Sequence, residues 1–388
     1  NVPVDHPRNL AFVPASPTRA AVMFDLVTSA SSIHGAYWME GAGGIFCENE
    51  AMQWIVSLTG LPEGAFGVFT SGGTAANLSA IVTAREYWRR DDTYKREKGL
   101  IITSIGAHSS IKAMAKVVDV DVLLVDTEDK LKAEALRETI INLTENQRKR
   151  LFAVVATGGT TNAGIIDDLE GIATVCEEEH LCFHVDAAYG GGALVADSVR
   201  HLFKGIEHAN SITIDPHKWM FSPYDCGAVI YKHPELAKAA HSQQGSYLDI
   251  FKDEGAIGFN PAEYQIQLTR RVRGLPLWFS LATHGTNRYK EAVERGLELA
   301  QIAGKMIEIH TDVELVREPS LSCVLFRRIG WNSEDYTNWT YENHSKGFAL
   351  VTPTKWKQGD TFETVSRFCF INPDTTENDI QSILDSMV

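Results

Sequence analysis

One lysine of this chain stands just past an apolar stretch and next to a histidine, in the segment Ile214-Asp215-Pro216-His217-Lys218-Trp219. A lysine amine attacks carbonyl carbons only after it loses its proton, and partial burial beside other polar groups lowers the pKa of a lysine toward neutrality. We therefore expect Lys218 to form a Schiff base. A second apolar stretch, Leu181–Asp186, ends in an aspartate whose carboxylate can face a ring nitrogen.

These two side chains together are typical of pyridoxal 5′-phosphate chemistry, in which a lysine holds the cofactor and an acidic residue faces its pyridinium nitrogen. The turn Gly72-Gly73-Thr74 offers a place for the phosphate, because it follows a predicted strand and opens a predicted helix. Free N–H groups and the helix dipole attract anions at such a turn. A glycine-rich turn can also be a simple tight connection, and the nearby lysine favours the phosphate interpretation.

Several motifs follow one another along the chain: Thr70–Asn77, Ala107–Ser110, Gly159–Thr161, His184–Tyr189, Asp215–Trp219 and Ser246–Leu248. In this order they resemble the group II pyridoxal-phosphate-dependent amino-acid decarboxylases, the family of aromatic amino-acid, glutamate and diaminobutyrate decarboxylases. The resemblance runs from about His6 to the C-terminus. It implies fold type I: a large α/β domain with a mostly parallel sheet, and a small C-terminal α+β domain.

The resemblance also implies which residues hold the cofactor. They would be Gly73, Thr74, His108, Thr160, Asp186, Ala188, His217 and Lys218.

Three of these residues would surround the cofactor ring. His108 would stack on one face beside the scissile carboxylate, Ala188 would pack against the other face, and Thr160 would lie near the phenolic oxygen. A histidine before Ser109-Ser110 can instead belong to a helix cap, and the sequence alone leaves both interpretations open.

The implied reaction is decarboxylation of an L-amino acid to its amine and CO2. The substrate would displace Lys218 from its aldimine, and Asp186 would keep the ring nitrogen protonated while a quinonoid forms. Tyr247 lies in a predicted mobile loop at about residues 243–260, and it matches the family tyrosine that protonates Cα. We therefore expect Lys218, Tyr247, His108 and Asp186 to be catalytic.

Some positions have no assigned role. Asp215 stands where some relatives have asparagine, and a carboxylate donates a hydrogen bond to phosphate only when it is protonated. Arg270, Arg271 and Arg273 could bind a substrate carboxylate or pair with acidic neighbours. Arg367 resembles a family arginine that reaches a bound carboxylate in some members.

The substrate is inferred from fewer residues. The segment His34–Trp38 resembles the region that lines the family's side-chain pocket, and its aromatic residues favour an aromatic amino acid. The glycines 190–192 resemble glutamate decarboxylases, so glutamate, diaminobutyrate or another non-aromatic substrate stays open, as does aldehyde synthase activity.

A metal-dependent hydrolase is the rival from another class, with His184, Asp186, Asp215 and His217 as ligands. His180 and His184 are four residues apart, but a predicted helix ends at the first and a predicted strand contains the second. The metal geometry of one helical face therefore does not apply. We predict no metal.

Composition restricts the partners. With 36 basic and 50 acidic residues, the net charge of −14 argues against nucleic acid and anionic membranes. No apolar run has the length of a membrane span. The six cysteines show no paired framework, which favours the cytoplasm. The expected partners are a small amino-acid substrate and a second copy of the chain, in a homodimer with shared active sites.

Apolar periodicity predicts alternating strands and helices over residues 65–231. Residues 1–64 are expected to form an N-terminal segment with the substrate-pocket and dimer region, 65–310 the cofactor-binding domain, and 311–388 the small domain. A long helix is expected from Leu277 toward His310. The predicted strands are 66–70, 100–103, 120–125, 151–156, 181–186 and 211–215, and the predicted helices are 74–89, 111–118, 131–143 and 169–180.

Overall fold

The computed structural model describes residues 1–243 and 259–387. Its largest element is a seven-stranded sheet in the order β1-β7-β6-β5-β4-β2-β3. β7 runs antiparallel to both of its neighbours, and the other pairs are parallel. The strands are β1 (Phe66–Thr70), β2 (Leu100–Ser104), β3 (Asp121–Val125), β4 (Leu151–Thr157), β5 (Cys182–Asp186), β6 (Ser211–Ile214) and β7 (Gly227–Tyr231).

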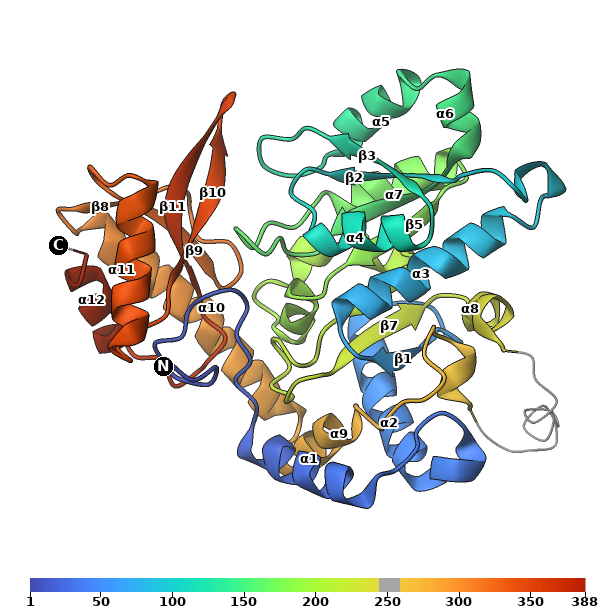
Figure 1. Ribbon diagram of the computed structural model, residues 1–388, viewed down its shortest axis with the longest axis horizontal. Coiled ribbons are helices and arrows are strands. Elements are labelled where there is room, and N and C mark those ends of the chain that lie inside the picture. The colour runs from blue at the N-terminus through green and yellow to red at the C-terminus, as the bar shows by residue number, and fades with distance from the viewer. Residues whose placement is uncertain (244–258, 388) are drawn as a thin grey trace.

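Helices pack around this sheet (Figure 1). Every residue of β4, β6 and β7 is buried, which is typical of a sheet covered on both faces. The helices of this part are α1 (Arg19–Ser31), α2 (Trp38–Thr59), α3 (Gly73–Trp88), α4 (Ser109–Val117), α5 (Ala133–Ile141), α6 (Glu145–Arg150), α7 (Leu169–Glu178), α8 (Pro234–His241) and α9 (Leu275–His284).

The C-terminal part is an antiparallel sheet in the order β10-β11-β9-β8, with a core of its own. α10 runs from α9 to this sheet, and its buried residues Leu299, Ala303 and Ile307 join that core (Figure 1). Leu10 from the N-terminal end of the chain joins it too. The elements are α10 (Thr286–Glu308), β8 (Val313–Leu315), β9 (Cys323–Arg328), α11 (Ser333–Ser345), β10 (Thr352–Gln358), β11 (Thr361–Cys369) and α12 (Glu377–Asp385).

Most predicted elements of the large sheet are confirmed. The six predicted strands end within one residue of the observed ones, and the four predicted helices within two. The single long helix from Leu277 is wrong, because α9 and α10 are separate helices. Gly285 lies between them with φ of 74°, a conformation that a glycine adopts without strain. The predicted domain boundaries stay a prediction.

Among the described residues, no helix combines the length and the apolar character that crossing a bilayer requires. The predicted loop at 243–260, with Tyr247, falls almost wholly outside the described residues.

Candidate active site

A cavity of about 740 Å³ opens where β5, β6 and β1 end. Parallel strands that end at one edge of a sheet bring the residues after them together, and ligands of open α/β sheets bind there. The sequence-predicted residues that line this cavity are Gly73, Thr74, His108, Asp186, Ala188, His217 and Lys218.

Lys218 is held by a carboxylate from its own loop. Its Nζ lies 3.0 Å from Oδ2 of Asp215, and its side chain is 20% exposed. Burial, the largest single influence, lowers the pKa of Lys218, but the charges of Asp215 and Asp186 outweigh burial and raise it above its usual value. The expectation of a lowered lysine pKa is therefore wrong for the cofactor-free chain, since two carboxylates stabilise the ammonium.

Asp215 occupies the space beside the first turn of α3. A Cβ added at Gly73 would come within 2.9 Å of Asp215 Oδ2, so a larger residue there would have to displace the carboxylate. Asp215 is 3% exposed, and its Oδ1 has no hydrogen-bond partner among the described residues. A carboxylate therefore lies at the turn that was predicted to bind phosphate.

Asp186 is held from two sides at the end of β5. Its Oδ2 accepts a hydrogen bond from Nδ2 of Asn77 at 2.9 Å, and its Oδ1 accepts one from the backbone N–H of Ala188 at 3.2 Å. Behind it, His184 contacts Asn77 Oδ1 through Nε2 at 2.9 Å and Ser211 Oγ through Nδ1 at 2.8 Å. Burial lowers the pKa of His184 to about 4, so this histidine is neutral at neutral pH.

His217 is oriented by the start of β7. Its Nδ1 accepts a hydrogen bond from the backbone N–H of Cys226 at 3.1 Å, so a neutral ring carries its proton on Nε2. Burial lowers the pKa of His217. A Cβ added at Gly72 would lie 3.4 Å from its Cε1, which places the imidazole against the glycine turn. His217 can thus donate from Nε2 beside the turn.

His108 is the N-cap of α4. Its Nδ1 accepts a hydrogen bond from the backbone N–H of Ser110 at 3.2 Å, so the capping interpretation is confirmed. His108 also lines the cavity, so the cap fixes one ring edge of a histidine that borders the site. The hydroxyl of Thr160 accepts a hydrogen bond from the backbone N–H of Ile165 at 3.1 Å, and its neighbours Gly159 and Thr161 line the cavity.

Asn77 and Tyr224 are among the lining residues that had no role in the sequence-based prediction. Asn77 belongs to the motif Thr70–Asn77, and its place one helical turn after Thr74 could have indicated it. Tyr224 lies with its ring centroid 4.9 Å from that of His217, and no sequence signal pointed to it.

The arginine cluster pairs with acidic residues. Arg270 is buried and makes two hydrogen bonds to the carboxylate of Glu48, at 2.7 and 2.8 Å. Arg273 Nε lies 3.0 Å from Asp225. Arg271 pairs with Asp25. Arg367 is buried and donates to the backbone oxygen of Phe12, a residue that lines the cavity.

The segment His34–Trp38 does not line the cavity of this chain. Tyr37 is buried against Ala36 and Ala262. The backbone N–H of Trp38 donates to Asn260.

The hydrogen bonds of the site do not agree with a metal centre formed by His184, Asp186, Asp215 and His217. Both ring nitrogens of His184 are already hydrogen-bonded inside the protein. Within residues 1–243 and 259–387, no three potential ligands gather in a way that could hold a metal ion.

The donor set fits pyridoxal phosphate. Lys218 offers an amine for the aldehyde, Asp186 a fixed carboxylate for the ring nitrogen, and His217 an N–H next to the α3 turn for the phosphate. The N-cap of α3, Gly72, has no capping side chain, so the first N–H groups of the helix are open to an anion. Asp215 is the carboxylate beside this turn, and its charge opposes a phosphate there.

Comparisons with known proteins agree with this fit. A family model described as "Pyridoxal-dependent decarboxylase conserved domain" matches residues 2–329. The aromatic-L-amino-acid decarboxylase of Bacillus atrophaeus is 32% identical over 395 residues, which cover 98% of this chain and 80% of that protein. The L-2,4-diaminobutyrate decarboxylase of Acinetobacter baumannii is 29% identical over 347 residues, covering 84% of this chain and 68% of the relative.

Solved structures share the architecture. Mouse CSAD is 26% identical with a TM-score of 0.87, over 99% of this chain and 84% of the other. Oryza sativa TDC with PLP and tryptamine has a TM-score of 0.88 over the same shares, and its 23% identity shows the fold alone. Together with the mostly parallel sheet, these likenesses confirm fold type I. The chain belongs to the pyridoxal-dependent decarboxylase family and is a pyridoxal-phosphate-dependent amino-acid decarboxylase.

Proposed function

We propose that this decarboxylase acts on an aromatic L-amino acid. The supporting observation is the apolar part of the cavity wall. Among the described lining residues, Lys218 is the one lysine and there is no arginine, so an acidic side chain would lack a cation. An apolar wall suits an aromatic ring. The larger apolar side chains of the cavity wall are Phe12, Val13, Leu78, Met114, Val117 and Ile266.

A diaminobutyrate substrate has less support. Its second amine would need a carboxylate outside the cofactor site, but the two carboxylates of the described lining, Asp186 and Asp215, both lie beside the residues assigned to the cofactor. Asp186 accepts from Asn77 and Ala188, and Asp215 pairs with Lys218. The name of the Bacillus relative also favours an aromatic substrate.

In the proposed site, each residue has one task. Bound pyridoxal phosphate supplies an electron sink for the pair that CO2 leaves on Cα. Lys218 bonds the cofactor, and Asp186 keeps the proton on the ring nitrogen, because a nearby carboxylate favours the cationic form. Gly73, Thr74 and His217 would hold the phosphate. His108 and Ala188 would hold the ring between them, and Thr160 would contact its phenolic oxygen.

The experiment that tests the substrate is mass spectrometry of products from a pool of amino acids that includes diaminobutyrate and cysteine sulfinate. We expect one new aromatic amine. A non-aromatic amine would overturn the substrate proposal and keep the reaction, whereas aldehyde with peroxide would indicate oxidative deamination.

Tyr247, outside the described residues, is proposed to protonate Cα. Tyr247→Phe removes the phenolic proton, so we expect amine formation to fall by about 100-fold or more, with some aldehyde in its place. Tyr264→Phe is the matched control, because Tyr264 packs against Phe259 outside the cavity lining. Unchanged amine output from Tyr247→Phe would remove it from the mechanism.

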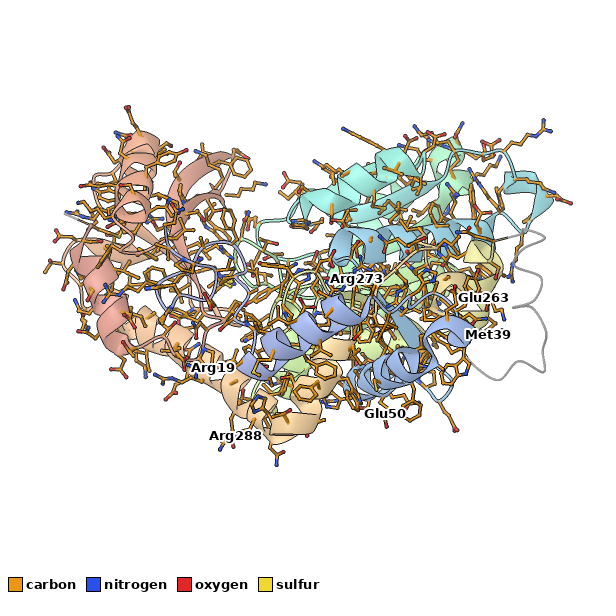
Figure 2. All side chains as sticks on the ribbon, turned by 60° about the horizontal axis from the view of Figure 1, so that its bottom comes forward. Arg19, Met39, Glu50, Glu263, Arg273 and Arg288 are labelled. Carbon is orange, nitrogen blue, oxygen red and sulfur yellow. The ribbon has the colours of Figure 1, made fainter. Side chains whose placement is uncertain are left out.

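We further propose a cytoplasmic homodimer whose active sites are shared. The six free thiols are compatible with a reducing compartment. α1 exposes Val22, Met23, Leu26 and Val27 on one face, while Phe24 stacks on Phe279 of α9. Met39 on α2 is also exposed, as Figure 2 shows. Exposed apolar faces of this kind mark protein contacts.

Light scattering tests whether the protein is a dimer, and hybrid dimers test whether the two subunits share their active sites. If Tyr247 serves the partner, a hybrid of Lys218→Ala and Tyr247→Phe subunits contains one site with both functional groups. Such hybrids should regain about half of the wild-type activity. Fully inactive hybrids would contradict shared sites.

A further inference from the structure

Lys218 and Asp215 form an ion pair inside the cavity, and its carboxylate is buried. The Nζ to Oδ2 distance is 3.0 Å, and the Asp215 side chain is 3% exposed. Oδ1 of Asp215 has no hydrogen-bond partner among the described residues. A buried carboxylate oxygen without a donor is costly, so the attraction to Lys218 is the main contact that keeps this side chain in place.

A purely structural role would make Asp215 a cap of α3. Its carboxylate does lie near the first turn, 2.9 Å from the position of a Cβ at Gly73. Yet no N–H of that turn donates to it, and the helix has no side-chain cap. The next cationic candidate is His217, whose Nε2 is 3.7 Å away, and burial lowers the pKa of that histidine. Lys218 is therefore the partner of Asp215.

We propose that Asp215 is the internal counter-ion of Lys218 in the cofactor-free enzyme, and that it limits cofactor capture by holding this lysine as an ammonium. The proposal rests on the assignment of Lys218 as the lysine that binds pyridoxal phosphate. Asp215 acts through Lys218 and is thus a positioning residue.

The ion pair affects cofactor binding through the protonation state of Lys218. An ammonium has no free electron pair, so it must first give one proton to solvent. The neutral amine then adds to the aldehyde carbon, its two remaining protons leave with the carbonyl oxygen as water, and a C=N bond forms. A carboxylate at 3.0 Å favours the ammonium and lowers the fraction of amine that can react.

Other titratable groups act on Lys218 from the elements around it. Asp186 also raises its pKa from the end of β5, so removal of Asp215 alone leaves part of the effect. The remaining titratable groups of the described lining are Tyr189 from the turn after β5, Tyr224 and His217 from the loop after β6, and His108 from the start of α4.

The test uses the full-length protein freed of cofactor and mixed with pyridoxal. Pyridoxal lacks the phosphate, so repulsion between phosphate and Asp215 does not enter. The rate of imine absorbance is followed from about pH 6 to about pH 10, and borohydride reduction with peptide mass spectrometry locates the adduct. We expect Asp215→Asn to capture pyridoxal about 10-fold faster at neutral pH, with its pH profile about one unit lower.

Two further variants complete the design. Asp215→Ser removes the same charge with a different shape, so it should show the same shift even where Asn misfolds. Asp225→Asn is the matched control, because Asp225 lies in the same loop but pairs with Arg273 at 3.0 Å. Its rate and profile should equal those of the wild type.

The results distinguish failure of the counter-ion proposal from failure of the cofactor assignment. Equal rates and profiles in the wild type and in folded Asp215 variants, with Lys218 modified in all, would overturn the counter-ion role and keep the cofactor assignment. If neither pyridoxal nor pyridoxal phosphate is trapped on Lys218 in any protein, the cofactor assignment fails, and the counter-ion proposal fails with it.

Discussion

The ends of β5 and β6 carry two buried aspartates in very different surroundings. At the end of β5, both oxygens of Asp186 accept hydrogen bonds, and neutral His184 fixes the donor Asn77 from behind. At the end of β6, Asp215 has one oxygen on Lys218 and one without a partner. Two carboxylates on neighbouring strands therefore differ in how tightly the protein holds them.

Asp186 is therefore held in a fixed position, whereas Asp215 can change its partner. A carboxylate whose partners are all side chains and backbone of the fold keeps its position when a ligand arrives, as a permanent contact requires. A carboxylate paired with the reacting lysine loses that partner when the lysine bonds another carbon. We infer that Asp186 serves the bound cofactor and that Asp215 serves the free enzyme.

Asp186→Asn should give the largest effect at the β5 end. An amide cannot hold a proton on the ring nitrogen, so we expect kcat to fall on the order of 1000-fold. Lys218 stays, so the variant should still bind cofactor, which visible absorbance and borohydride bleaching would check. Near-normal kcat with bound cofactor would contradict the assigned role of Asp186.

Asn77→Ala tests whether the hydrogen bonds behind Asp186 matter. It removes the donor to Oδ2 and leaves Nε2 of His184 without its partner, so we expect kcat to fall about 10- to 100-fold. Ser79→Ala is the matched control, because Ser79 is buried on the same helix and its hydroxyl donates to the backbone oxygen of Ala75. Equal activity of the two variants would mean that Asp186 needs no such support.

The role of Asp186 was easier to predict from the sequence than the role of Asp215. Strand periodicity located the ends of β5 and β6 within one residue, and so brought Asp186 and Lys218 to one edge. Periodicity cannot show which side chain meets which across the gap. The contact of Asn77 with Asp186 depends on how α3 packs over the sheet, and the contact of Asp215 with Lys218 depends on how the loop after β6 turns.

Other features also depended on tertiary contacts. The charge of Arg270 suggested ligand binding as readily as pairing, and only the position of Glu48 on α2 decides for pairing. The break between α9 and α10 at Gly285 was missed, because apolar periodicity continues on both sides of that glycine. β7 was missed as well, since a short apolar stretch after a loop carries little periodicity.

The smallest expected effect concerns stability and the neutral state of His184. Its pKa is about 4 in the folded chain, against an ordinary value of 6.5. Between these values the unfolded chain binds more protons, so the free energy of unfolding should fall as the pH drops from about 6.5 toward 4, by at most about 3 kcal/mol from this group. His184→Asn, which keeps polar atoms toward Asn77 and Ser211 but does not titrate, should lose less stability over this range in urea unfolding. If both proteins lose stability in parallel, the histidine is protonated without cost, and the β5 end is less rigid than its hydrogen bonds indicate.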